Sequence, residues 1–242
     1  MVLCAVAIMI STCLTGCKMN SGKIRFGSAG IGGTYQIFGD TFANLISSKS
    51  KKYNIEVKTT AGSAANLRLL SKDYIQMAVA QMDLINDAYN RTGIFENDKK
   101  YQGYRAVASL YTEACQIVVP ADSDIQSMDD LEGKKVCIGE EESGTEQNAL
   151  QILNAYGLNE RLVDTVNLNY TDAAKKLKSG DIDAFFCTAG VQTTVINELS
   201  KQCKIRLVSL DQKGVSRLKK SYKFYTEYTI PAGTVSYTHL RA

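Results

Sequence analysis

Short apolar runs that alternate with amphipathic stretches are the feature that most constrains the fold of this 242-residue chain. From Lys23 onward, runs typical of buried strands lead into glycine-rich or hydroxyl-rich turns and then into segments with apolar residues at helical spacing. The repeat predicts an α/β protein with mainly parallel strands. A looser polar stretch around 92–102 interrupts it, so two lobes of about a hundred residues each are expected rather than one continuous sheet.

The composition excludes several classes of protein. Hydrophobic residues make up 45% of the chain and charged residues 22%, which is typical of a folded protein and argues against disorder or many membrane spans. The net charge of +3 comes without a dense basic cluster, so nucleic acid is not an expected partner.

The N-terminal residues 1–22 are expected to be a signal peptide and a tether. Met1–Gly16 carries no charge, and the apolar run Val2–Ile10 is too short to span a bilayer. The sequence Leu14-Thr-Gly-Cys17 resembles the bacterial lipobox, which implies that Cys17 becomes the lipid-modified N-terminus of an extracytoplasmic, membrane-anchored protein. The alternative is an ordinary signal with an incidental cysteine.

Cysteine and histidine usage argues against a metal site and against catalysis by an activated nucleophile. The sole histidine, His239, lies near the chain end, so Ser-His or Cys-His chemistry is not expected. No C-x-x-C spacing occurs, and neither a zinc site nor a cofactor is predicted. The body cysteines are expected to be free and buried, with one disulfide left open as an alternative: Cys115, Cys137, Cys187 and Cys203.

The glycine-rich turn Gly27–Gly33 fits neither familiar nucleotide motif. A Walker loop needs a Lys after its last Gly, and Gly33 and Thr34 follow Gly32 instead. A dinucleotide fingerprint needs a third Gly where this chain has Tyr35. The turn therefore predicts only a close backbone approach and a helix N-terminus able to face an anion, with Tyr35, Phe38, Phe42, Leu45 and Ile46 on one helix face.

Small and hydroxyl residues follow the predicted strands, at the sheet edge where open α/β sheets bind ligands. Because these turns contain no Lys or Arg, they suit a carboxylate held by neutral dipoles. The alternative for each Ser or Thr is helix capping without any ligand. Glu140–Glu142 is interpreted as a solvated loop.

Five segments in order resemble the TAXI-type solute receptors of tripartite ATP-independent periplasmic (TRAP) transporters, over about 24–233. They are Gly27–Tyr35, "TTAGSAANLRLL" at Thr59–Leu70, "AVAQMD" at Ala78–Asp83, "GEEESGTEQNALQIL" at Gly139–Leu153 and "GDIDAFFCTAG" at Gly180–Gly190.

The resemblance implies a type II periplasmic-binding-protein fold, two α/β lobes around a ligand cleft. It implies a small organic acid or amino acid as ligand, glutamate-like or a 2-oxoacid dicarboxylate, delivered to a permease driven by an ion gradient. The ligand-side positions that it implies are Thr34, Tyr35, Ser63, Asn66, Gln81, Ser143, Gly144, Thr145, Thr188 and Gly190.

The expected division places lobe 1 at 23–112, lobe 2 at 113–210, a crossover back to lobe 1 at 211–233 and an atypical tail at 234–242. Chains of the resembled family continue beyond "YTEYTIPAGT", so the C-terminal part is expected to be truncated.

Three rival classes of function remain open. The first is a binding protein that serves an ATP-driven importer or a sensor kinase. The second is an enzyme that uses Ser143 or Asp83, because α/β turns carry many chemistries. The third is a surface interaction lipoprotein without a small ligand.

Overall fold

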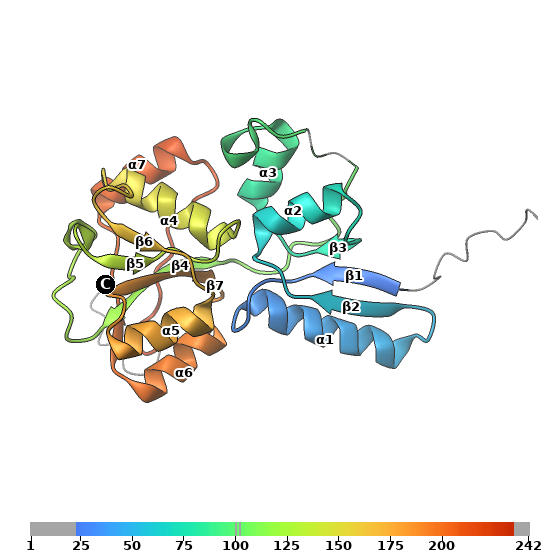
Figure 1. Cartoon of the computed structure of the whole chain (residues 1–242), viewed down its shortest axis with the longest axis horizontal. Coiled ribbons are helices and arrows are strands. Elements are labelled where there is room, and N and C mark those ends of the chain that lie inside the picture. The colour runs from blue at the N-terminus through green and yellow to red at the C-terminus, as the bar shows by residue number, and fades with distance from the viewer. Residues whose placement is uncertain (1–22, 100, 102, 235–242) are drawn as a thin grey trace, which may run out of the picture.

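The computed structural model describes residues 23–99, 101 and 103–234, which form two lobes, each built on its own β-sheet (Figure 1). The first lobe has a three-stranded sheet in the order β2-β1-β3, and both strand pairs are parallel. Its elements are β1 (Lys23–Gly27), α1 (Thr34–Lys49), β2 (Asn54–Lys58), α2 (Ser63–Ser71), β3 (Met77–Ala78), α3 (Met82–Asn90) and a 3₁₀ turn (Gly93–Phe95).

The second lobe has a five-stranded sheet in the order β6-β5-β7-β4-β8. The strands β5, β6 and β7 run parallel, whereas β4 runs antiparallel to both β7 and β8. Its elements are β4 (Ala114–Pro120), a 3₁₀ turn (Asp129–Leu131), β5 (Lys135–Cys137), α4 (Gly144–Ala155), β6 (Asp164–Val166), α5 (Tyr170–Ser179), β7 (Ala184–Ala189), α6 (Thr194–Gln202), β8 (Ile205–Leu207) and α7 (Gln212–Ser221).

The core of the second lobe lies on both faces of its sheet. Strand β7 is buried except at Thr188, which is partly exposed. Its alternating side chains divide between the faces: Phe186 packs with α4 and α7, and Phe185 with α5 and α6. Figure 1 shows these helix pairs on opposite sides of the sheet. Cys137 and Cys187 pack as apolar residues here, and the four described cysteines are free.

In the first lobe, α1 covers one face of the narrow sheet through Phe38 and Phe42, which pack on Phe26. Helices α2 and α3 pack together through a separate cluster around Leu67. Leu45, expected on the inner face of α1, is instead 53% exposed, because the apolar stripe of α1 is wider than the three strands it covers.

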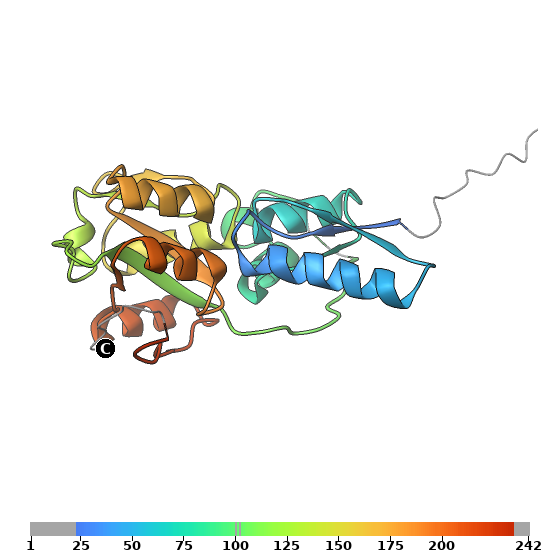
Figure 2. The same ribbon diagram turned by 90° about the horizontal axis from the view of Figure 1, so that it is seen from below.

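Residues 103–113 connect the lobes as an extended segment along one side of the molecule (Figure 2). The segment 211–233, expected to cross back to lobe 1, instead stays against lobe 2. Helix α7 packs on α4, and Tyr225 donates a hydrogen bond to Gln151 of α4 at 2.7 Å. Leu218, Tyr222 and Tyr225 explain this position, because they bury apolar surface on the core around α4.

Within the described ranges, no helix combines the length and the apolar character needed to cross a membrane. Cys17, His239 and most of the expected tail lie outside the described residues.

Candidate functional site

A cavity lies between the two lobes, with about 460 Å³ of space between its lining atoms, open solvent included. Its walls are the turns that follow β1, β2 and β3 in the first lobe, and in the second the turns that follow β5 and β6 together with the carboxyl end of β7. The parallel strands of both sheets therefore direct their carboxyl ends at one space. The lining residues are Ala29, Gly30, Gly33, Thr34, Tyr35, Ala61, Gly62, Ser63, Gln81, Glu113, Glu140, Ser143, Gly144, Thr145, Leu168, Asn169, Tyr170, Thr188 and Ala189.

Helix N-termini from both lobes meet at this cavity. The first turns of α1, α2, α4 and α5 contribute to its lining, and Gln81 is the N-cap of α3. The N-caps of α1 and α2 are Gly33 and Gly62, which have no side chain to accept from the helix N–H groups. The cavity is thus surrounded by the positive ends of helix dipoles, which suit an anionic group.

Capping explains only some of the polar residues at these turns. Ser143 accepts a hydrogen bond from the Glu146 N–H at 3.0 Å, and Asn169 accepts one from the Asp172 N–H at 2.9 Å. Thr34 and Ser63 are instead the first residues of their helices, and Ser63 Oγ accepts from the Gln81 N–H at 3.1 Å.

The structure brings eight of the ten expected ligand positions to the cavity wall. They are Thr34, Tyr35, Ser63, Gln81, Ser143, Gly144, Thr145 and Thr188. Gly190 lies just beyond the wall, where an added Cβ would be 3.6 Å from Thr34 Oγ1.

Asn66 is not part of the wall, and its role is to hold the first lobe together. Its amide donates to the carbonyl of Ser28 at 2.7 Å and to that of Val79 at 2.9 Å, and its oxygen accepts from Thr60 at 2.8 Å. A fully buried side-chain amide satisfied by two neighbouring segments is a structural element rather than a ligand contact.

The lobes touch across the cavity. Gln81 Nε2 donates to Asn148 Oδ1 at 3.1 Å, and Thr193 Oγ1 donates to the Gly32 carbonyl at 3.3 Å. An added Cβ at Gly30 would overlap the Glu140 carboxylate, and one at Gly144 would overlap the Gln81 amide. An added side-chain carbon at either position would therefore displace the end of the Glu140 or the Gln81 side chain from its present place between the lobes.

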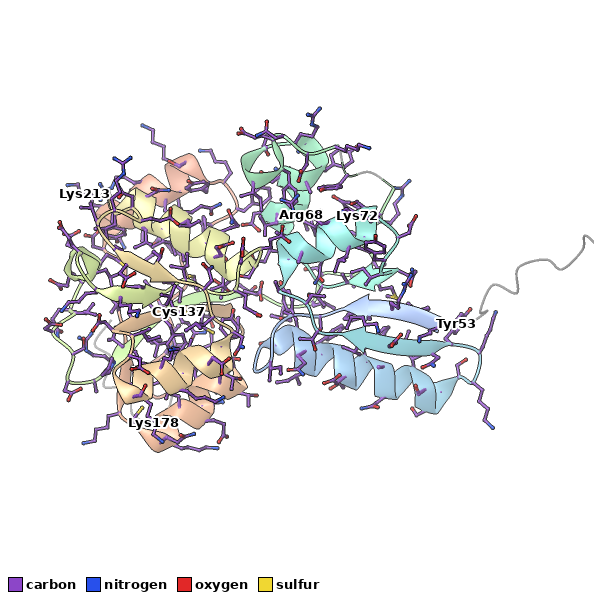
Figure 3. The ribbon with its side chains drawn as sticks, in the orientation of Figure 1. Tyr53, Arg68, Lys72, Cys137, Lys178 and Lys213 are labelled. Carbon is purple, nitrogen blue, oxygen red and sulfur yellow. The ribbon has the colours of Figure 1, made fainter. Side chains whose placement is uncertain are left out.

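An ion pair also joins the lobes beside the cavity. Arg68 on α2 contacts Asp98 of its own lobe and lies 2.9 Å from Glu142 Oε1 of the second lobe (Figure 3). The loop 140–142 is thus not uniformly solvated, contrary to its interpretation from sequence. Glu140 lines the cavity and Glu142 pairs with Arg68, while Glu141 is exposed.

Glu113 is a lining residue that sequence reasoning missed, and of the two lining carboxyl groups it has the larger rise in pKa. The Tyr35 hydroxyl donates to its carboxylate at 2.9 Å. Burial raises the pKa of Glu113 to about 7, partly offset by the hydrogen bonds from Tyr35 and Gln81. Burial also raises the pKa of Glu140 and that of Asp83. Among the lining residues the structure describes, none is Lys, Arg or His.

Tyr170, also missed, organises the second-lobe wall. Its hydroxyl donates to the Thr188 carbonyl at 2.9 Å and therefore accepts from Thr145 Oγ1 at 2.5 Å. Two lining atoms remain buried without a hydrogen-bond partner, Gln81 Oε1 and Thr188 Oγ1. The described residues contain no cluster of three His, Cys, Asp or Glu side chains suited to a metal ion.

Comparisons with known proteins agree with this architecture. A family model described as the NMT1-like family matches residues 26–239. The alkanesulfonate-binding protein SsuA from Xanthomonas axonopodis pv. citri, solved with bound MOPS, is 18% identical, with a TM-score of 0.52 over 78% of this chain and 60% of that one. An ancestral arginine-binding protein bound to arginine is also 18% identical, with a TM-score of 0.52 over 84% of this chain and 93% of that one.

A binding-protein component of an ABC phosphonate transporter from Pseudomonas aeruginosa is 12% identical, with a TM-score of 0.55 over 88% of this chain and 77% of that one. At such identities the likeness establishes the fold, which is of the type II periplasmic-binding-protein class. The chain spans about 60% of the length of the SsuA structure it matches.

Proposed function

This chain belongs to the NMT1-like family, and from its site we propose that it is an extracytoplasmic solute-binding protein. It captures a small organic acid or amino acid between its lobes and delivers it to a membrane permease of the TRAP type. Binding is reversible and no chemical step occurs.

The observation that carries this proposal is the cavity itself, which takes its wall from both lobes. Helix N-termini of the first lobe face those of the second across the same space, so a carboxylate placed there gains contacts with both. These contacts exist together only when the lobes are close, so a ligand of this kind stabilises the closed arrangement.

A binding role also agrees with how the reactive side chains are used. Ser143 Oγ caps α4, and Asp83 Oδ1 accepts from the Leu84 N–H at 2.9 Å. Both candidates for an enzymatic role are thus engaged in backbone hydrogen bonds, and no base is paired with Ser143 in the described hydrogen bonds.

The transporter type rests on the sequence resemblance to TAXI-type receptors. An ATP-driven importer is the alternative, and two similar structures favour it, because they are binding proteins of ABC transporters for an amino acid and a phosphonate. Solute uptake into proteoliposomes that contain the permease encoded beside this protein separates the two alternatives. A TRAP system needs an ion gradient, whereas an ABC system needs ATP hydrolysis. Lipid anchoring through Cys17 remains a prediction, checked by mass spectrometry of the mature N-terminus.

Thermal unfolding of the purified protein with a panel of small organic acids and amino acids tests the binding function. A ligand that binds only the folded state raises Tm by mass action. At a ligand concentration of a hundred times Kd it stabilises the folded state by about 2.7 kcal/mol. We expect at least one member to shift Tm in a saturable way. Absence of any shift, with no small molecule co-purifying by mass spectrometry, would reject the binding function.

A further inference from the structure

We propose that the solute carries a protonated amine beside its carboxylate, and that Glu113 binds this amine. The inference rests on the proposed function and selects within it, favouring an amino acid over a 2-oxoacid dicarboxylate.

The first observation is an excess of hydrogen-bond acceptors in the cavity. Glu113 contributes a carboxylate, and Gln81 Oε1 is buried without a donor. An amide oxygen and an ionised carboxylate can accept hydrogen bonds but cannot donate them. Buried acceptors need donors. The wall supplies Glu113 with hydrogen bonds from Tyr35 and Gln81, which leaves part of the carboxylate's acceptor capacity open, and it supplies none to Gln81 Oε1. An ammonium group has three N–H donors and no acceptor, so it complements both oxygens.

The second observation is the charge of the wall. It holds two carboxylates, Glu113 and Glu140, and none of its described residues is cationic. Asp83 lies near enough to raise the pKa of Glu113 further. A second carboxylate on the ligand would meet these groups with like charge in a partly desolvated space. A cationic group would instead neutralise the buried charge that the protein leaves unpaired.

The third observation is that the remaining wall suits the opposite charge. The first turns of α1 and α2 have no side-chain cap and present backbone N–H groups and positive dipole ends, although the Ala65 N–H of α2 already donates to the Glu142 carbonyl at 3.2 Å. One cavity therefore combines an anion-binding region with a cation-binding carboxylate, and a zwitterion satisfies both. Glu113 is favoured over Glu140 as the amine site because Tyr35 holds it in place by a 2.9 Å hydrogen bond.

The experiment compares matched pairs of ligands by titration calorimetry of the full chain at about pH 8, where Glu113 is ionised. The probes are the common L-amino acids that have a primary α-amine, with the corresponding 2-oxo acids, such as L-glutamate with 2-oxoglutarate. The two members of a pair differ only in an ammonium or a ketone. We expect an amino acid to bind at least about tenfold more tightly than its 2-oxo partner.

Two further measurements place the effect on Glu113. Glu113→Gln is expected to weaken amino-acid binding by about thirtyfold or more, because the amine loses its charge partner. The matched control Glu141→Gln removes the same charge from an exposed position of the second lobe and should leave Kd unchanged. For the wild type, Kd should rise by about tenfold per pH unit below 7, since binding then requires Glu113 to lose its proton.

The outcomes separate the two proposals. Tighter binding of a 2-oxo acid, or affinity that rises toward low pH, overturns the amine assignment and leaves the binding function in place. Failure of both ligand classes to bind rejects the binding function itself. If Glu113→Gln fails to fold by circular dichroism, the ligand pairs and the wild-type pH series still decide the question.

Discussion

A single carboxyl group, that of Glu113, should make the stability of the unliganded protein depend on pH. Its pKa is about 7 in the folded state, above the ordinary value of 4.5, because burial disfavours the charged form. Between these values the folded state holds a proton that the unfolded state has released, so the free energy of unfolding falls as pH rises from about 4.5 to about 7. Below about pH 4.5 the contribution of Glu113 to the free energy of unfolding is constant.

Urea unfolding at several pH values checks this prediction. Glu113→Gln should flatten the pH dependence and raise stability at neutral pH, since the amide carries no charge to bury. If the free energy of unfolding changed with pH in the same way in the wild type and in Glu113→Gln, the prediction would be wrong. Glu141→Gln serves as control, because an exposed carboxyl should leave the wild-type curve in place.

Residue types in local turns were the predictable part of the site. Thr34, Ser63 and Thr145 were found from sequence because strand-to-helix turns bring such residues to one sheet edge regardless of distant contacts. Glu113 was missed because it enters the cavity at the end of a long connecting segment, which no local pattern places. Asn66, predicted at the ligand, lies off the cavity wall, because a buried amide that joins two strands has the same local signature as one that faces a solute.

At the scale of elements, the start of α4 should control how closely the lobes approach. Gly144 is the first residue of this helix, so alanine suits its backbone, but the added methyl would overlap the Gln81 amide across the cavity. We expect Gly144→Ala to weaken ligand affinity by about tenfold or more while the melting temperature without ligand changes little.

Titration calorimetry and thermal unfolding of the variant measure these two effects. Asn154→Ala is the matched control, because it places alanine at an exposed position of the same helix. Unchanged affinity in Gly144→Ala would show that the closed contact between α4 and Gln81 is not needed for binding.

The order of strands and helices followed from sequence periodicity, but two placements did not. The chain enters β4 from the cleft, at the sheet edge where β5 and β7 have their carboxyl ends. Strand β4 therefore runs antiparallel to β7, and the hydrophobic periodicity of the sequence does not encode this direction. Helix α7 stays with lobe 2 because Leu218 and the tyrosines after it bury apolar surface there. Its mainly polar sequence gives little indication of which lobe it covers.

For the whole molecule, the pair between Arg68 and Glu142 should favour the closed arrangement slightly. The atoms lie 2.9 Å apart but are not aligned as a hydrogen bond, and the two side chains are 24% and 46% exposed. A pair so open to solvent contributes about 0.2–1 kcal/mol. Glu142→Gln is therefore expected to weaken ligand binding by no more than about fivefold.

This small effect should also depend on salt. The difference between the wild type and Glu142→Gln should shrink when calorimetry is repeated at about 0.5 M instead of about 0.05 M salt, because ions screen exposed charges. Glu141→Gln should show neither effect. A large loss of affinity that persists at high salt would indicate that Glu142 acts on the cavity rather than through Arg68.

Glu113 is also the last residue before β4, where the segment 103–113 enters the second lobe. Under the proposed function, a solute bound to Glu113 would lie beside the segment that joins the lobes. Rotation of the lobes about this segment would move the charged contact less than the outer ends of the lobes, so occupancy of a small cavity would become a large change of outline that a membrane partner could recognise without touching the solute.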